Sequence, residues 1–295
     1  MKQRQWKENV AGYLFILPSL IGFCIFMVYP FINSFLISFM DWDNFGGFAG
    51  SEFIGLENYK ETLTNDYFKT GLTNNLGMLF IAVPILLMIS LIIANVMNTK
   101  IFARGALRTA YFLPYITTVT ASSMVFAALF HEEYGPINSL IRMFGVDNPP
   151  GWLNATKTVM ITIGIFWIWR MMGYCIIIFL SGLQGISPSY YEAASIDGAN
   201  TWQKFKSITF PLVSPTTFFL AITMGIFSLQ MMAEVKVMTS GGPGSASYTM
   251  ALLIYREAFE KYNMGFASAI AVIFFGIILV ITLIQWYGQK KWVNY

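Results

Sequence analysis

The sequence predicts an all-α membrane protein with six transmembrane helices. Of the 295 residues, 56% are hydrophobic and only 11% are charged, whereas about a quarter of the residues in soluble domains are charged. An apolar helix of about 20 residues crosses a bilayer core about 30 Å thick. Six apolar stretches reach about that length or more: 12–40, 72–97, 107–130, 158–180, 214–234 and 266–287.

The first apolar stretch predicts a retained helix and not a cleaved signal peptide. It follows a basic segment but continues to about Met40, far beyond the short apolar core of a signal peptide. Because Pro18 and Pro30 lie within it, we expect a kink or a portion at the membrane interface. The predicted organisation is one transmembrane domain over residues 12–287, between short terminal segments 1–11 and 288–295.

The positions of lysine and arginine predict that both termini are cytoplasmic, because cytoplasmic loops are enriched in these residues. Arg170 lies within the fourth apolar stretch, 158–180, and is therefore assigned to neither side of the membrane. One side of the membrane receives Lys2, Arg4, Lys7, Lys100, Arg104, Arg108, Lys204, Lys206, Lys290 and Lys291; the other receives Lys60, Lys69, Arg142, Lys157, Lys236, Arg256 and Lys261. A formal net charge of only +3 gives no support to nucleic-acid binding.

A polar segment, residues 187–215, separates the fourth and fifth stretches and would therefore be cytoplasmic. Ser187 or Ser189 can cap a first short helix, and Pro188 suits its first position. Ser189 with Glu192 also matches the S-x-x-E capping box. Gly198 is a natural helix stop, because glycine enters the left-handed conformation at little cost.

A second short helix can start at Asn200 or Thr201, and Pro211 and Pro215 are expected to end it before the fifth stretch. Trp202, Phe205 and Ile208 recur in it at near-helical spacing. Local physics leaves two interpretations open. The segment is either a capped hairpin at the membrane surface or a docking element, whose small alanines at positions 193, 194 and 199 permit close approach by another protein. Glu192 could cap its own helix or contact that partner.

The same segment, EAASIDGANTWQKFKSITFPLVSP, resembles the EAA loop of ABC-importer permeases. That pattern has a glycine six residues after the glutamate and an isoleucine ten further on, and Gly198 and Ile208 occupy these places. Phe210 stands where the family usually has leucine. Further stretches resemble the first permease of the carbohydrate-uptake branch: 14–18 with Tyr29-Pro30, 55–59, 183–186, 239–243 and 265–269.

The resemblance implies a type I ABC importer permease fold, in a bacterial cytoplasmic membrane, with a coupling helix between helices 4 and 5. The expected partners are a second homologous permease, two ATPase subunits and an extracellular or periplasmic sugar-binding protein. The chain contains no G-x-x-x-x-G-K-[ST] loop, so ATP and Mg²⁺ are expected to be used by the partner ATPase and no cofactor by this chain. The residues expected to couple to the ATPase are Glu192, Ala193, Ala194, Asp197, Gly198 and Ala199.

Polar and aromatic residues in or beside the fourth and fifth stretches are candidates for a substrate pathway. Buried polar side chains in membranes tend to face a cavity or another helix, and sugars present flat apolar faces with hydroxyl rims. The candidates are Trp167, Arg170, Tyr174, Gln230, Glu234 and Lys236. Aromatic residues can instead anchor span ends, and Arg170 can extend to a membrane surface. Lys236 stands where family members usually have tyrosine; with Arg170, it suggests an acidic sugar.

Two other classes of protein are disfavoured. A stand-alone secondary transporter driven by an ion gradient would need intramembrane carboxylates, and only Glu234 lies near a stretch. A membrane enzyme would need a nucleophile–base pair or a metal site. His131 is the only histidine and sits beside Glu132 and Glu133, which favours a surface cluster, and no metal site is expected.

Overall fold

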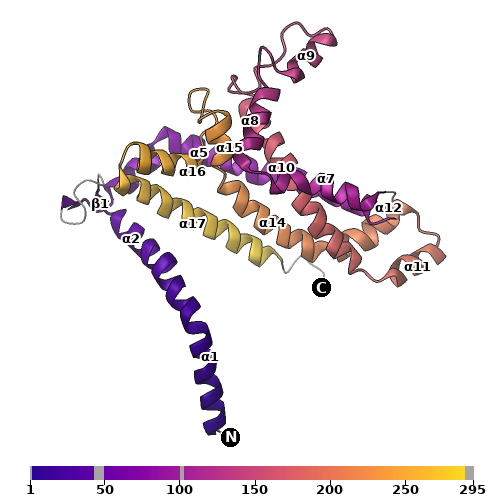
Figure 1. Cartoon of the computed structure of the whole chain (residues 1–295), viewed down its shortest axis with the longest axis horizontal. Coiled ribbons are helices and arrows are strands. Elements are labelled where there is room, and N and C mark those ends of the chain that lie inside the picture. The colour runs from indigo at the N-terminus through magenta and orange to yellow at the C-terminus, as the bar shows by residue number, and fades with distance from the viewer. Residues whose placement is uncertain (1, 43–49, 100–102, 290–295) are drawn as a thin grey trace. The chain divides into compact units, whose positions relative to one another are not determined.

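The computed structural model describes residues 2–42, 50–99 and 103–289, and these are mostly helical (Figure 1). They form two compact units, Met1–Thr64 with Ile254–Phe275 and Asn65–Leu253 with Gly276–Tyr295. We call them unit 1 and unit 2. The cations predicted at Lys100, Lys290 and Lys291 lie outside the described residues, and so do the side chains of Lys2, Arg4 and Lys7. The predicted single domain over 12–287 stays a prediction.

Unit 1 begins with one helical run, which is α1 Lys2–Phe23, a π-helical turn η1 Cys24–Val28 and α2 Tyr29–Ile37. It continues with β1 Met40–Asp41, β2 Glu52–Phe53, α4 Glu57–Thr64 and the π turn η4 Arg256–Glu260. The two strands pair antiparallel. Asn58 secures the chain between α2 and β1, because its Nδ2 donates to Ser38 O and Met40 O, both at 3.0 Å. Trp42 O accepts from the backbone N–H of Met264 at 2.9 Å, so the start of α17 is fixed to the same region.

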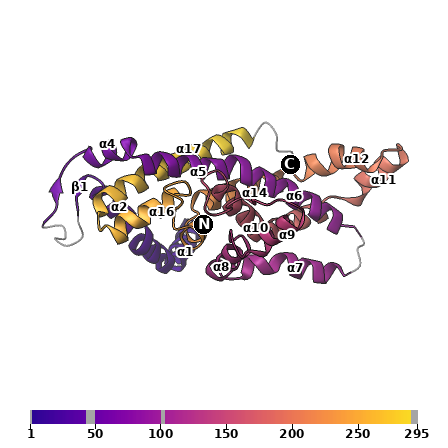
Figure 2. The same ribbon diagram turned by 90° about the horizontal axis from the view of Figure 1, so that it is seen from above.

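Unit 2 contains most of the helices. In chain order these are α5 Asp66–Gly77, η2 Met78–Ala82, α6 Val83–Met97, α7 Arg104–Ile116, α8 Val119–Leu129, α9 Pro136–Met143, α10 Val159–Gln184, α11 Pro188–Ile196, α12 Thr201–Lys204, η3 Phe205–Thr209, α13 Phe210–Leu212, α14 Ser214–Leu229 and α15 Ala233–Met238. Two more helices, α16 Met250–Tyr255 and α17 Met264–Gln289, contribute residues to both units. Helix α10 packs against α6, α7 and α14 (Figures 1 and 2). Its fully buried Phe166, Ile163 and Phe179 form the centre of the core.

Three π-helical turns each end two residues before a proline, at Pro30, Pro84 and Pro211. Proline has no backbone N–H, and its ring clashes with the carbonyl four residues earlier. In each turn the residue before the proline donates to the carbonyl five residues back: Tyr29 to Cys24, Val83 to Met78 and Phe210 to Phe205. This wider turn moves the clashing carbonyl away, so the helix continues through the proline. The second hairpin helix was expected to end at Pro211 and Pro215; it continues through Pro211 and ends at Leu212, before the break at Val213.

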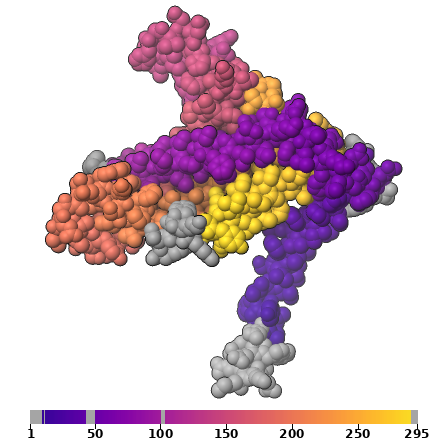
Figure 3. Space-filling model, turned by 180° about the vertical axis from the view of Figure 1, so that it is seen from behind, coloured from indigo at the N-terminus to yellow at the C-terminus, as the bar shows by residue number. Residues whose placement is uncertain are grey.

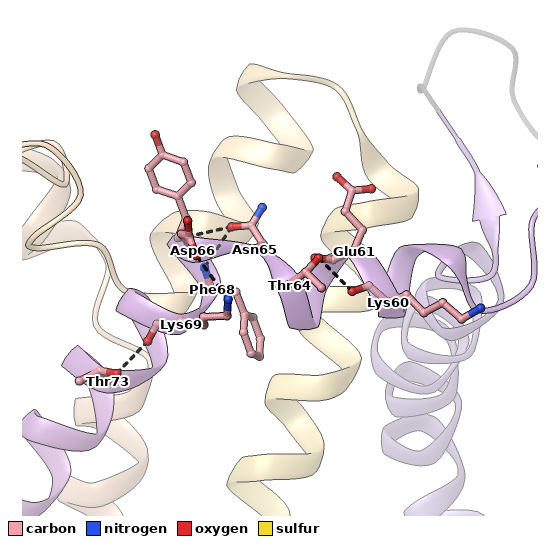
Figure 4. Close-up of polar contacts among 9 residues, drawn as sticks. Lys60, Glu61, Thr64, Asn65, Asp66, Phe68, Lys69 and Thr73 are labelled. Carbon is pink, nitrogen blue, oxygen red and sulfur yellow. Dashed lines mark hydrogen bonds and ion pairs between the residues drawn. The ribbon is translucent and has the colours of Figure 1, made fainter.

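Helix α5 starts at a side-chain cap made by Asn65 (Figure 4). Asn65 Oδ1 accepts from the backbone N–H of Tyr67 at 2.9 Å and from that of Phe68 at 3.2 Å. Asp66 adds a negative charge in the first turn, where the helix dipole favours it. Helix α5 with η2 and α6 then forms the candidate span Asp66–Met97, which starts earlier than the predicted residue 72.

By length and composition, the described residues contain four helices that could cross a membrane, or six spans if two bent helix pairs are each one span. The four are Gly12–Ile37, Asp66–Met97, Val159–Gln184 and Met264–Gln289. The six-span prediction holds in this form, but the prediction of one continuous helix over 107–130 is wrong. Helices α7 and α8 meet at 97° because Thr117 and Thr118 are extended, and Thr117 Oγ1 donates back to Pro114 O at 2.8 Å.

The fifth predicted stretch, 214–234, is also divided. Helix α14 ends at Leu229, and Gln230 lies in the turn that leads to α15. At its other end, α14 meets the helix over Thr201–Leu212 at 63°. Glu234 therefore lies on a separate short helix and not at the end of a span.

Asn75 holds three segments of unit 2 together from a fully buried position. Its Nδ2 donates to Ser228 O at 3.2 Å and to Leu229 O at 2.8 Å, and its Oδ1 accepts from Met250 N at 2.8 Å. The amide therefore supplies partners to the carboxyl end of α14 and the amino end of α16, whose backbone groups lack partners within their own helices.

We expect Asn75→Leu to lower the thermal unfolding midpoint of the detergent-solubilised protein. The substitution leaves three buried backbone groups without the amide, and each such group costs about 1–3 kcal/mol. The matched control is Asn95→Leu on α6, a half-buried amide for which the structure shows no side-chain hydrogen bond. Equal midpoints for the two variants would contradict the role given to Asn75.

Candidate functional site

A cavity of about 560 Å³ lies in unit 2 beside the middle of α10. Three regions supply its walls: α7, α10, and the segment from the end of α14 to the start of α15. The lining residues are Tyr115, Trp167, Arg170, Met171, Phe227, Gln230, Met231, Met232, Ala233 and Glu234. The break after Leu229 makes this wall, because it turns Gln230 and Glu234 toward the same space as α10.

The structure brings four of the six predicted pathway residues to this cavity: Trp167, Arg170, Gln230 and Glu234. Tyr174 does not line it but lies against Tyr115, with ring centroids 5.1 Å apart. Lys236 lies on α15 outside the lining. Trp167 exposes only 1% of its surface, so its ring packs mainly within the core.

Sequence reasoning missed two aromatic residues of the lining. Phe227 precedes Gln230 by three residues within the predicted fifth stretch, a spacing that could have placed them on one face of a continuous helix. Tyr115 comes from α7 and had no such signal, because only tertiary packing brings it to α10. With Phe227 and the methionines, Tyr115 gives the cavity the apolar surface that the sequence analysis expected from other aromatic residues.

Arg170 and Glu234 form a loose ion pair in this cavity, with Arg170 Nη1 4.0 Å from Glu234 Oε1. Their side chains are only 16% and 9% exposed. A charge-assisted hydrogen bond between such groups is normally about 2.7–2.9 Å long. In addition, Arg170 Nε is buried and has no hydrogen-bond partner among the described residues. Because Nη1 is beyond hydrogen-bond distance of Glu234, the guanidinium retains capacity there to donate to hydroxyl or carboxylate oxygens of a ligand.

The segment between α10 and α14 forms a helical hairpin, which we define as residues 187–212. Ser187 has extended backbone before α11 and Pro188 is its first residue, as predicted. The predicted capping box of Ser189 and Glu192 is wrong, because α11 has no side-chain cap. Since the helix begins at Pro188, Ser189 is already inside it, and its Oγ lies 2.9 Å from Ser187 Oγ. Glu192 therefore makes no helix cap and lies exposed.

The bend of the hairpin forms as predicted. Gly198 adopts a left-handed conformation with φ +78°, and Ala199 N donates to Ala194 O at 2.9 Å, closing the end of α11. Asn200 then starts α12 with a capping box: its Oδ1 accepts from Gln203 N at 2.9 Å, and its N–H donates to Gln203 Oε1 at 2.8 Å.

Two side-chain bonds link the two arms of the hairpin. Tyr191 OH lies 3.0 Å from Thr209 Oγ1, and Lys204 Nζ donates to Ser195 Oγ at 2.7 Å. Figures 2 and 3 show the hairpin at one end of unit 2, beyond the end of α10. Its surface exposes four large hydrophobic side chains, of which Ile196 at 87% and Trp202 at 69% are the most exposed; the others are Tyr190 and Phe210.

The fold and the site together define a helical protein with several candidate membrane spans, a largely apolar cavity that contains the Arg170–Glu234 pair, and an exposed hairpin. The family model described as "Binding-protein-dependent transport system inner membrane component" matches residues 78–292. The chain belongs to this family of inner-membrane transport components.

Curated relatives and a solved structure agree with this placement. The arabinooligosaccharides transport system permease protein AraP of Bacillus subtilis is 33% identical over 96% of this chain and 91% of its own length. The lactose transport system permease protein LacF of Rhizobium radiobacter is 30% identical over 96% of this chain and 95% of its own length. A chain in the crystal structure of a bacterial alginate ABC transporter, in complex with an alginate pentasaccharide-bound periplasmic protein, has a TM-score of 0.78 at 22% identity. That match covers 98% of this chain and 96% of the other.

These similarities confirm the predicted fold class and the carbohydrate-uptake class of permease. The chain is a sugar ABC importer permease of the inner membrane, and its curated relatives are named as transport permeases. The predicted roles of individual cavity and hairpin residues stay predictions.

Proposed function

We propose that this chain forms half of the translocation pore of an ATP-driven carbohydrate importer and that hairpin 187–212 contacts the ATPase. The observation that carries the proposal is the exposed apolar surface of a braced, sharply bent hairpin. Contiguous exposed apolar surface marks sites of protein contact. Ile196 and Trp202 supply that surface, and the small side chains of Ala193, Ala194 and Ala199 permit close approach.

In this proposal, Gly198 makes the bend while Glu192 and Asp197 provide exposed charges beside it. Both termini and the hairpin are cytoplasmic, as the lysine and arginine pattern predicts. A second homologous permease completes the pore, two ATPase subunits bind and hydrolyse ATP with Mg²⁺, and an extracellular or periplasmic sugar-binding protein delivers the substrate. This chain itself binds no cofactor.

Copurification tests the ATPase contact. The tagged chain, coexpressed with its partner permease and ATPase, is expected to retain both through affinity purification. Ile196→Glu combined with Trp202→Glu is expected to lose the ATPase and keep the partner permease. The matched control is Phe144→Glu, which replaces an apolar residue that is 87% exposed after α9 and should keep both partners. Retention of the ATPase by the double variant would refute the hairpin contact.

Arg170 is the proposed hydrogen-bond donor to substrate in the cavity. We expect Arg170→Gln to lower the rate of uptake by about tenfold or more, because a hydrogen bond from a charged group contributes about 1.5–3 kcal/mol. Lys157→Gln, at an exposed position before α10, is the control and should transport at the wild-type rate. Unchanged uptake by Arg170→Gln, measured with radiolabelled sugar in proteoliposomes, would exclude Arg170 from the pathway.

The substrate is proposed to be an oligosaccharide, and the finer hypothesis is that it is acidic. The positive charges of Arg170 in the cavity and of Lys236 on α15 support an acidic sugar. The negative charge of Glu234 offsets that of Arg170 and is evidence against an acidic sugar. The hypothesis predicts that Lys236→Ala lowers uptake of uronic oligosaccharides more than uptake of neutral ones. Equal transport of both sugar types by wild type and by Lys236→Ala would remove the basis of the acidic-sugar hypothesis.

A further inference from the structure

Two arginines of α7 converge on one side-chain oxygen at the end of α10. The Gln184 amide is assigned with its oxygen toward α7, because only this orientation gives the two arginines an acceptor; the oxygen then accepts from Arg104 Nη2 at 2.8 Å and from Arg108 Nη2 at 3.2 Å. Gln184 is the last residue of α10, and Arg104 is the first residue of α7. The bond therefore joins the carboxyl end of one helix to the amino end of another.

This arrangement needs Gln184, because the two arginines are otherwise poorly stabilised. They lie near the amino end of α7, where the helix dipole disfavours positive charge, and the first turn of α7 has no acidic residue. Among the described residues, no carboxylate forms an ion pair with either arginine, and the Nε atoms of both are buried without a hydrogen-bond partner. The Gln184 oxygen, together with the negative end of the α10 dipole, is the favourable partner that they have.

The position of Gln184 in the chain connects this contact to the hairpin. Only Gly185, Ile186 and Ser187 separate it from the first residue of α11. Gln184 and Glu192 also line the same cavity of about 440 Å³ at the base of the hairpin. Since the Tyr191–Thr209 and Lys204–Ser195 bonds brace the hairpin internally, a force on its tip is delivered to this base.

Helix α7 connects the same contact to the substrate cavity. Tyr115, near the other end of α7, lines the cavity beside Arg170. Eleven residues separate Tyr115 from Arg104, about 16 Å along a helix at 1.5 Å per residue. Between these two points α7 lies tightly on α10, because a Cβ at Gly173 would overlap the Tyr111 carbonyl. A displacement at the Gln184 end can therefore move α7 as a unit.

We propose that Gln184 is a positioning residue that fastens α7 to the base of the hairpin and so transmits ATPase-driven movement to the Tyr115 wall of the substrate cavity. The proposal rests on the proposed function, because it requires that the hairpin contact an ATPase. Gln184 touches neither substrate nor nucleotide in this role. Its action depends on accepting two hydrogen bonds, a property that glutamate shares and leucine lacks.

The test compares uptake with ATP hydrolysis in proteoliposomes that contain the complete transporter. Gln184→Leu is expected to assemble with the ATPase and hydrolyse ATP, while sugar transported per ATP falls about five- to tenfold, within the usual range of coupling between sites. Gln184→Glu should restore the ratio to near wild type, because a carboxylate accepts from both guanidinium groups. The matched control, Asn98→Leu, changes another polar residue of the same cavity and should leave the ratio unchanged.

The outcomes separate this inference from the function on which it rests. If the wild-type chain recovers no ATPase, the proposed function fails. If the complex assembles and Gln184→Leu transports as much sugar per ATP as wild type, or if Gln184→Glu fails to rescue, the inference is wrong. Should Gln184→Leu prevent assembly, Arg104→Gln with Arg108→Gln removes the donors while keeping Gln184. A wild-type transport ratio in that double variant would also overturn the inference.

Discussion

Gly198→Pro in hairpin 187–212 is expected to abolish carbohydrate uptake while the chain still inserts in the membrane. Gly198 has a φ of +78°, whereas proline is fixed near −65°. Proline would also remove the backbone N–H that donates to Ser195 O at 3.2 Å. The bend at the end of α11 cannot form, so the surface that is proposed to contact the ATPase is lost. Because the change lies outside the candidate spans, the amount of chain in isolated membranes should stay near wild type.

The control for this prediction is Gly198→Asn, since asparagine tolerates the left-handed conformation better than other residues with a side chain. A Cβ at position 198 meets no atom within 4 Å, so sterics do not oppose the change. Uptake by Gly198→Asn should stay well above that of Gly198→Pro. Wild-type uptake by Gly198→Pro, measured at equal membrane content, would refute the role of the bend in coupling.

Gly173→Ala on α10 is expected to destabilise unit 2, whereas Gly164→Ala on the same helix is not. A Cβ there would overlap the Tyr111 carbonyl and the Phe112 Cα, and these are backbone atoms that cannot move without shifting α7. Overpacking of a well-packed interior typically costs about 1–3 kcal/mol, and close contact through small residues is how membrane helices associate. We expect a lower yield of folded protein and a lower unfolding midpoint in detergent.

Gly164→Ala provides the matched control on the same helix. Its Cβ would lie 3.7 Å from Met78 Sδ, an ordinary van der Waals distance. Alanine favours helix over glycine by about 1 kcal/mol, so this variant should be as stable as wild type or slightly more so. A midpoint for Gly173→Ala that matches Gly164→Ala would show that α7 can move away from α10 at little cost.

Local signals predicted the hairpin well and the breaks within spans poorly. The left-handed conformation of Gly198 and the helix cap at Asn200 could be predicted, because each depends only on residues a few positions away. The choice between Ser187 and Ser189 was harder, since both precede suitable helix formers, and the extended backbone at Ser187 decided it. The break at Thr117 and Thr118 had no clear signal, because threonine is common in membrane helices and apolar residues continue on both sides.

The charged residues of the cavity could be predicted from the sequence, whereas the residues that helix packing brings to its walls could not. Arg170 and Glu234 stood out because charge inside or near a span requires a partner or a cavity. Tyr115 could not be identified, since its position depends on how α7 packs against α10. Lys236 lies outside the lining, on the short helix α15 that begins at Ala233 after the break that follows Leu229, and its role in the substrate pathway stays a prediction.

The π turns before Pro30, Pro84 and Pro211 have a consequence for how these helices are altered by insertion and deletion. Each π turn holds one residue more than an α turn, and one residue corresponds to a rotation of about 100° about the helix axis. The residues beyond each proline are therefore rotated by about 100° about the helix axis, compared with their positions in a continuous α-helix. Removing a single residue from Phe205–Thr209 would restore an ordinary α turn locally, yet it would rotate α14 relative to the hairpin and misdirect every side chain that follows.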